Sequence, residues 1–117
     1  MGESVLRDKS KQYAIEIVNT CRRLRSQHVE MPLIDQLLRS GTSVGANIHE
    51  ARYAQSKKDF ITKLQIALKE CNESEYWLSL LNETKSIPKD DYECLNKRCW
   101  ELRRMLIASL TTSKTDG

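Results

Sequence analysis

QLLRSGTSVGANIHEARYA, residues 36–54, is the stretch that decides the predicted fold. At the ~100° turn per residue of an α-helix, its apolar residues fall on one side and its polar residues on nearly the opposite side. The apolar side holds Ile34, Leu37, Gly41, Val44, Ile48 and Ala51, and the polar side holds Arg39, Ser43, Ala46, Asn47 and Glu50. A solvated face carries interchangeable Lys and Glu, whereas this one carries short hydrogen-bonding side chains between one Arg and one Glu. We therefore expect the polar row, Arg39, Ser43, Asn47 and Glu50, to contact a partner.

Two glycines inside this stretch, Gly41 and Gly45, argue against a helix, since each costs about 1 kcal/mol relative to Ala in a helix interior. The apolar residues before and after these glycines nevertheless keep one helical spacing, so they stay on the same side of a single helix. Both glycines lie on or beside the apolar side, where a missing side chain lets a neighbouring backbone approach. We favour one continuous helix over two helices broken near Gly41. A P-loop is excluded, because no Gly-Lys-Ser or Gly-Lys-Thr follows the glycines and no strand precedes them.

The composition is typical of one small helical domain. The chain has 117 residues, of which 30% are charged and 39% hydrophobic, with only four Gly and two Pro. No apolar run approaches the ~18 residues that a membrane helix needs, and residues 1–11 lack an apolar signal core. We therefore predict an all-α protein that is cytoplasmic and has no membrane partner.

Apolar periodicity and capping signals divide residues 1–117 into four helices of a single domain. We expect helices at about 8–27, 32–54, 57–83 and 88–110, followed by a disordered tail at 111–117. Pro32 suits the first turn of the second helix, and Ser56 with Asp59 resembles the capping box that starts a helix. The connections are short, and short connections join antiparallel neighbours. The predicted fold is an antiparallel up-and-down four-helix bundle.

The third helix carries a second row of side chains beside its core stripe. Ile66, Glu70, Glu73, Trp77 and Leu80 recur at helical spacing on a different side of this helix. A monomeric bundle needs one apolar stripe per helix, so an exposed row with Ile and Trp indicates a second neighbour. The alternative is that Trp77 wraps over a helix end. Ile66, Glu70, Glu73 and Trp77 are named the glutamate row below.

The polar row and the glutamate row are chemically complementary. An arginine such as Arg39 is the natural bidentate partner of a glutamate such as Glu73, and Asn47 both donates and accepts hydrogen bonds. The rows either join two helices within one protomer or join protomers in a closed ring. Because each helix already has a core stripe, we favour the ring.

Basic residues are concentrated in the first half of the chain. The net charge is +3; residues 1–58 hold ten Lys or Arg and six Asp or Glu, a net +4, whereas residues 59–117 hold nine and ten, a net −1. The candidate nucleic-acid contacts are Arg22, Arg23, Arg25, Arg52, Lys57 and Lys58. Tyr53 is the only aromatic residue among them, so we expect binding that is salt-sensitive and of low sequence selectivity. For the arginine cluster of the first helix, Arg22, Arg23 and Arg25, the alternative is a solvated face whose cations complement a helix C-terminus.

The sequence contains no recognisable catalytic or metal-binding constellation. Di-iron bundles need Glu-x-x-His pairs, and neither His28 nor His49 has a Glu three residues before it. Cys94 and Cys99 are five residues apart and do not form a Cys-x-x-Cys pair, and the other two cysteines lie on apolar stripes that disfavour a thiolate. We therefore expect no enzyme activity, no metal and no cofactor.

Three runs of sequence carry a family resemblance. They are RSGTSVGANIHEA from Arg39, QSKKDFI from Gln55 and IALKECNESEYWL from Ile66. They resemble the small bacterial four-helix-bundle proteins associated with intervening sequences in 23S rRNA genes, whose relatives include the accessory variability protein of diversity-generating retroelements. The resemblance covers roughly residues 9–110. The matching positions are Arg39, Ser43, Asn47, Glu50, Glu73 and Glu75, and the departures are Gly45, often Pro in the family, and Cys71, usually Leu or Ala.

The resemblance implies an antiparallel four-helix bundle that assembles as a ring, a homopentamer. For the accessory variability protein it implies nucleic acid and a reverse transcriptase as partners; for most members no activity is known. We expect an oligomeric scaffold that binds RNA or DNA through basic surface residues. The alternative is a protein–protein adaptor, for example for a reverse transcriptase, with no direct nucleic-acid binding. The salt dependence of binding distinguishes these two hypotheses, because a nucleic-acid binder loses its polynucleotide steeply as the salt concentration rises.

Overall fold

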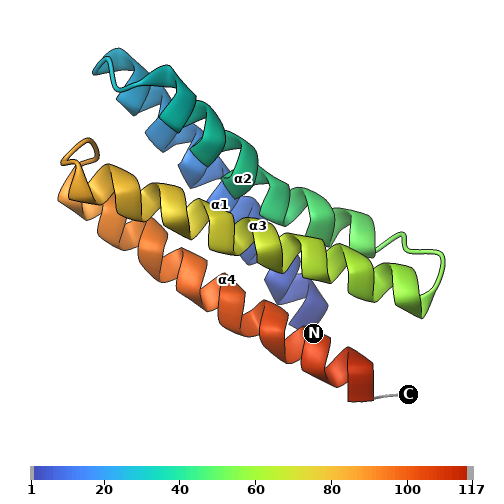
Figure 1. Ribbon diagram of the computed structural model, residues 1–117. Coiled ribbons are helices and arrows are strands. Elements are labelled where there is room, and N and C mark those ends of the chain that lie inside the picture. The colour runs from blue at the N-terminus through green and yellow to red at the C-terminus, as the bar shows by residue number, and fades with distance from the viewer. Residues whose placement is uncertain (1, 116–117) are drawn as a thin grey trace.

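Four helices make up the computed structural model, which describes residues 2–115 (Figure 1). They are α1 (Gly2–Ser26), α2 (Met31–Ala51), α3 (Lys57–Glu83) and α4 (Lys89–Thr115). Each helix runs antiparallel to the next, and α4 packs beside α1 to close the bundle. The fold is therefore the predicted all-α up-and-down bundle, with extents of 49 × 21 × 19 Å. Within residues 2–115, no helix is both long and apolar enough to cross a membrane.

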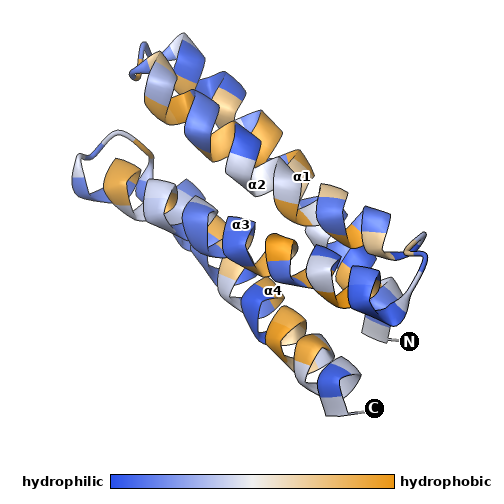
Figure 2. Cartoon of the chain, turned by 45° about the vertical axis from the view of Figure 1, so that its right-hand side comes forward, coloured by the Kyte–Doolittle hydropathy of each residue, from blue (hydrophilic) through white to orange (hydrophobic). Residues whose placement is uncertain are grey.

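One apolar core runs through the bundle and receives side chains from every helix. Hydrophobic and hydrophilic residues alternate along each helix in Figure 2, as expected when one stripe of an amphipathic helix faces inward. Tyr13, Ile17, Leu37, Val44 and Leu78 are completely buried. This core fixes the rotation of each helix about its axis and so decides which side chains meet on the surface.

Helix α2 is continuous through its two glycines, as predicted. A Cβ atom at Gly41 would lie 2.9 Å from Ile17 Cγ1 of α1, and a Cβ atom at Gly45 would lie 3.3 Å from the backbone oxygen of Ser10. Both distances are shorter than an ordinary carbon contact. The glycines therefore let α1 pack closely against α2, and this packing offsets their poor helix propensity.

We expect Gly41→Val to lower the free energy of unfolding by about 2 kcal/mol, although Val is a better helix former than Gly. The added side chain collides with Ile17, which is completely buried. Urea unfolding followed by circular dichroism measures the loss. Ala46→Val is the matched control, because Ala46 is exposed on the same helix. Equal losses in the two variants would rule out the packing role of Gly41.

The outer ends of the first and last helices differ from the prediction. α1 begins at Gly2 and not near residue 8, because Leu6 is buried and extends the apolar stripe of α1 towards the N-terminus. α4 continues to Thr115, so residues 111–115 of the predicted disordered tail are helical. No Gly or Pro interrupts this last stretch, and Thr115 Oγ1 donates to the carbonyl oxygens of Thr111 and Thr112 at 3.0 Å. Residues 116–117 lie outside the described residues.

The connection between α2 and α3 brings several basic residues to one end of the bundle. α2 ends at Ala51, before the predicted residue 54, and residues 52–54 continue with tighter turns whose backbone N–H groups bond three residues back. α3 has the expected bounds, and Ser56 Oγ caps it by accepting from the Asp59 backbone N–H at 3.0 Å. Arg52, which follows α2 in this connection, lines a groove together with Arg7 near the N-terminal end of α1, and Lys57 begins α3 at the same end of the bundle.

Candidate functional site

The polar row on α2 and the glutamate row on α3 face each other within one protomer. Arg39 Nη1 lies 3.2 and 3.1 Å from the two carboxylate oxygens of Glu70, and Arg39 also forms an ion pair with Glu73. Trp77 Nε1 donates to Glu73 Oε2 at 3.1 Å while its ring packs against the core. The two rows therefore join two helices of one chain. Arg39 needs no second protomer, contrary to the arrangement that we favoured from the sequence, and the ring itself stays a prediction.

The other members of the polar row bond within α2 or point outward. Ser43 Oγ donates to the Arg39 carbonyl oxygen at 2.6 Å, and Asn47 Nδ2 donates to the Ser43 carbonyl oxygen at 2.8 Å. Glu50 is exposed, and Ile66 of the glutamate row is 37% exposed. The described contacts thus assign Arg39, Glu70 and Glu73 a structural role between α2 and α3.

The ion pair at the centre of the two rows alters the pKa of both partners. Hydrogen bonds from Arg39 and then from Trp77 lower the pKa of Glu73 below its ordinary value. The hydrogen bond to Glu73 raises the pKa of the Arg39 guanidinium. Both groups are therefore charged at neutral pH, and the pair weakens only in acid.

The free energy of unfolding of the wild type is expected to fall between about pH 7 and about pH 3, and that of Glu73→Gln is expected to fall less. Because the folded-state pKa of Glu73 is depressed, its contribution is present above the unfolded pKa of about 4.3 and is lost as pH falls through the folded-state pKa. The side chains of Glu73 and Arg39 are 34% and 47% exposed, so the effect is below about 1 kcal/mol. Urea unfolding at the two pH values measures it. Glu93→Gln, at an exposed position, is the control, and a wild-type pH dependence in Glu73→Gln would refute the role of the pair.

The six basic residues predicted to contact nucleic acid do not form one patch. Because α1 and α2 are antiparallel, Arg22, Arg23 and Arg25 lie near the α1–α2 turn, whereas Arg52, Lys57 and Lys58 lie at the opposite end of the bundle. In the first group, Arg23 donates to Thr20 Oγ1 at 3.1 Å and pairs with Asp91 of α4 at 3.3 Å. That arginine therefore has a structural partner, and the second group is the better candidate for a ligand.

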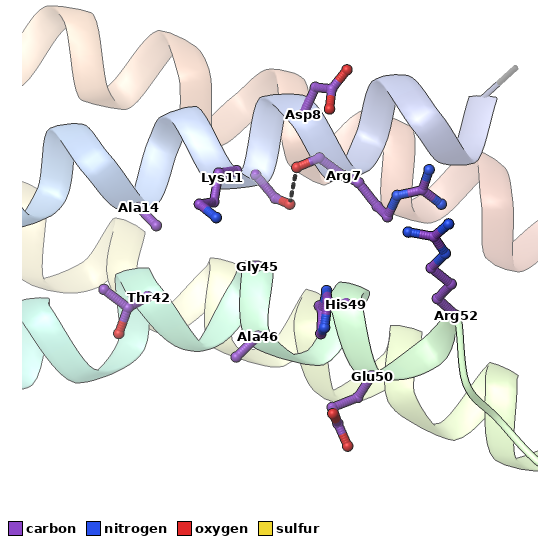
Figure 3. Close-up of a pocket in the computed structure, with 11 residues that line it drawn as sticks. Arg7, Asp8, Lys11, Ala14, Thr42, Gly45, Ala46, His49, Glu50 and Arg52 are labelled. Carbon is purple, nitrogen blue, oxygen red and sulfur yellow. Dashed lines mark hydrogen bonds between the residues drawn. The ribbon is translucent and has the colours of Figure 1, made fainter.

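A groove of about 550 Å³ lies between α1 and α2 at the end that carries Arg52 (Figure 3). Its lining includes the small residues Ala14, Gly45 and Ala46. Basic and imidazole side chains also line it: Arg7, Lys11, His49 and Arg52. The small residues leave the space, and Arg7, Lys11 and Arg52 contribute positive charge to its lining.

Arg7 and Arg52 direct their guanidinium groups toward one another across the end of this groove in Figure 3. Two carboxylates, Asp8 and Glu50, also line it, but both point away from its interior. Within residues 2–115, neither arginine forms an ion pair, in contrast to Arg39 on the neighbouring face. Two like charges that converge without a carboxylate between them form a site suited to an anion.

Sequence reasoning identified Arg52, Lys57 and Lys58 but missed Arg7 and Lys11. Arg7 was placed outside the first helix, which was expected to start near residue 8. The available signal was their spacing, since Arg7, Lys11 and Ala14 recur at i, i+4 and i+7 and so share one face of α1. Their meeting with Arg52 depends on the antiparallel packing of α1 on α2.

The four cysteines form no disulfide, and the surroundings of Cys21 and Cys71 raise the pKa of their thiols. Cys71 and Cys99 are buried with their sulfur atoms 3.5 Å apart, and contact with Cys99 together with burial raises the pKa of the Cys71 thiol. Burial raises the pKa of Cys21 to about 11. Within residues 2–115, no group of three or more His, Cys, Asp or Glu side chains is placed to hold a metal ion.

Comparison with known proteins shows the family of this chain and a solved structure that it resembles. The family model described as 23S rRNA-intervening sequence protein matches residues 3–108. A crystal structure of a protein of unknown function from the S23 ribosomal protein family of Bacteroides thetaiotaomicron is 48% identical, with a TM-score of 0.91 over 95% of this chain and 99% of that chain. No curated protein matches the chain.

Proposed function

Because the chain belongs to the family of 23S rRNA-intervening sequence proteins, we propose that it is a non-enzymatic binding protein that takes up RNA at the groove between α1 and α2. One observation carries the proposal: Arg7 and Arg52 converge there with no carboxylate between them. Lys11 lines the same groove, and Lys57 and Lys58 begin α3 at the same end of the bundle. These five side chains are named the basic end.

The electrostatics of the basic end favour a polyanion. Two guanidinium groups held close together repel each other, and a phosphate between them replaces that repulsion by two charge-assisted hydrogen bonds. Neutralising phosphates also releases counterions from the RNA, which makes the affinity depend on salt. The groove offers no paired acid and base and no activated nucleophile, so binding is the chemistry that it supports.

Assembly into a homo-oligomeric ring, a homopentamer, is the second part of the proposal. A ring repeats the basic end around an axis, so that weak phosphate contacts from several protomers add by multivalency. Exposed apolar side chains offer surface for such contacts between protomers: Tyr76 on α3 and Trp100 and Ile107 on α4 are 58%, 46% and 44% exposed.

Light scattering tests both parts in one experiment. The mass is measured across a protein dilution series, first alone and then with a generic single-stranded RNA at about 50 and about 200 mM salt. We expect a stable mass near five times the 13.6 kDa protomer, and an added RNA mass that falls steeply at the higher salt. A protomer mass at every concentration would contradict the ring. RNA binding that is absent or independent of salt would contradict the basic end.

A protein–protein adaptor is the second candidate, and the outer face of α4 favours it. Trp100 and Ile107 lie seven residues apart on one side of this helix, and the Arg103 guanidinium stacks 4.9 Å from the centre of the Trp100 ring. Aromatic residues flanked by arginine are enriched at protein interfaces. In the same experiment, a stable oligomer that binds no RNA at either salt would favour this candidate.

A further inference from the structure

Tyr53 presents its ring to solvent beside the basic end. It follows α2 in the tight turn before α3 and is 66% exposed, the highest value among the exposed large hydrophobic residues described. Its ring centre lies 5.5 Å from that of His49, with the planes tilted by 60°. The Arg52 guanidinium lies 5.9 Å from the same ring centre. The described contacts thus leave much of the Tyr53 ring uncovered.

The two neighbours of Tyr53 also line the groove. Both His49 and Arg52 belong to the groove lining, and Arg52 meets Arg7 there. Arg52 therefore links the convergent cations to the exposed ring. A single exposed tyrosine is ordinary on a protein surface. Tyr53 differs because its neighbour Arg52 converges with Arg7, and these two arginines form no ion pair within residues 2–115.

Building on the proposed function, we infer that this site takes an unpaired nucleotide of single-stranded RNA, with a phosphate between Arg7 and Arg52 and the adjoining base stacked on Tyr53. Proteins that bind single strands combine a positively charged groove with aromatic side chains on which bases stack. Every base has a π-face, so such stacking tolerates sequence. The site therefore selects for strandedness and only weakly for base identity.

Paired RNA does not satisfy this arrangement. In a duplex both faces of each base are covered by neighbouring bases, and sequence-independent contacts are made with phosphates and 2′-hydroxyl groups. A free phosphate or a lipid headgroup would occupy the groove without using Tyr53. If removing the Tyr53 ring lowers the affinity, the bound ligand is therefore a nucleotide and not a free phosphate or a lipid headgroup.

The test compares four ligands with the full-length protein at low salt. They are a labelled oligoadenylate, an abasic ribose-phosphate strand of the same length, a duplex RNA and inorganic phosphate as a competitor. Fluorescence anisotropy gives the affinity for each labelled strand. We expect oligoadenylate to bind about 10-fold more tightly than the abasic strand, since stacking on one aromatic residue contributes about that factor.

Three variants assign this difference to Tyr53. Tyr53→Leu is expected to weaken oligoadenylate binding about 10-fold and to leave the abasic strand unaffected. Tyr53→Phe keeps the ring and is expected to bind like the wild type. Met31→Ala is the control and is expected to bind both strands like the wild type, because Met31 is a 48% exposed apolar residue at the start of α2, at the end of the bundle opposite Tyr53.

The outcomes distinguish this inference from the function on which it rests. If Tyr53→Leu binds oligoadenylate like the wild type, or if the duplex binds as tightly as the single strand, the stacked nucleotide is ruled out while RNA binding at the basic end stands. Displacement of every strand by inorganic phosphate with equal ease would also count against stacking. If no strand binds at low salt, both the inference and the proposed function fail.

Discussion

Charge reversal at Arg7 and Arg52, in the double variant Arg7→Glu with Arg52→Glu, is expected to weaken RNA binding about 100-fold at about 50 mM salt. Hydrogen bonds to a charged partner contribute about 1.5–3 kcal/mol each, and each 1.4 kcal/mol is about tenfold in affinity. Losing one such bond from each arginine therefore accounts for the expected loss. Fluorescence anisotropy with a labelled single-stranded RNA measures it.

The matched control reverses two charges at the other end of the bundle. Arg22→Glu with Arg25→Glu changes the net charge by the same amount, and both residues are exposed near the α1–α2 turn. We expect a loss of less than about threefold, because these positions contribute only to the overall field of the protein. Circular dichroism confirms that both variants fold. Equal losses would mean that net charge determines binding, and the groove would then be excluded as the site.

The fold could be predicted from the sequence because the spacing of apolar residues and the helix caps depend on residues that are close together in the chain. The apolar period through Gly41 and Gly45 predicted a continuous α2, and Ser56 marked the start of α3 where the structure has it. The helix ends that were missed depend on tertiary contacts. Leu6 is buried against the other helices and continues the stripe of Tyr13 and Ile17, but residues 2–8 hold too few apolar residues to show a helical period of their own.

The candidate site was predicted only in part, because it depends on which helix faces meet. The unusual residue types marked the polar row and the glutamate row, but only the structure places Arg39 against Glu70 and Glu73 of the same chain. Likewise, the sequence grouped Arg25 with Arg52, although the bundle is 49 Å long and they lie at opposite ends. Arg7 joins Arg52 because antiparallel packing brings the start of α1 to the end of α2.

Tyr13→Ala is expected to lower the free energy of unfolding by about 4 kcal/mol, within the 3–5 kcal/mol typical of removing a buried aromatic ring. Tyr13 is completely buried, and its hydroxyl lies 2.9 Å from Ser74 Oγ of α3. Burial raises the pKa of Tyr13 well above its ordinary value, so the group is a neutral phenol and this contact involves no ion. Urea unfolding at one fixed protein concentration measures the loss, since the stability of an oligomer depends on concentration.

Two further substitutions separate ring packing from hydrogen bonding. Tyr53→Ala removes the same atoms at a 66% exposed position and is expected to change stability by less than about 0.5 kcal/mol. Tyr13→Phe removes only the hydroxyl and is expected to cost about 1 kcal/mol. Ser74 Oγ keeps the Cys71 carbonyl oxygen as a partner at 2.9 Å, so no buried hydroxyl is left unpaired. If Tyr13→Phe cost as much as Tyr13→Ala, the hydrogen bond to Ser74, and not the packing of the ring, would be the main contribution of Tyr13 to stability.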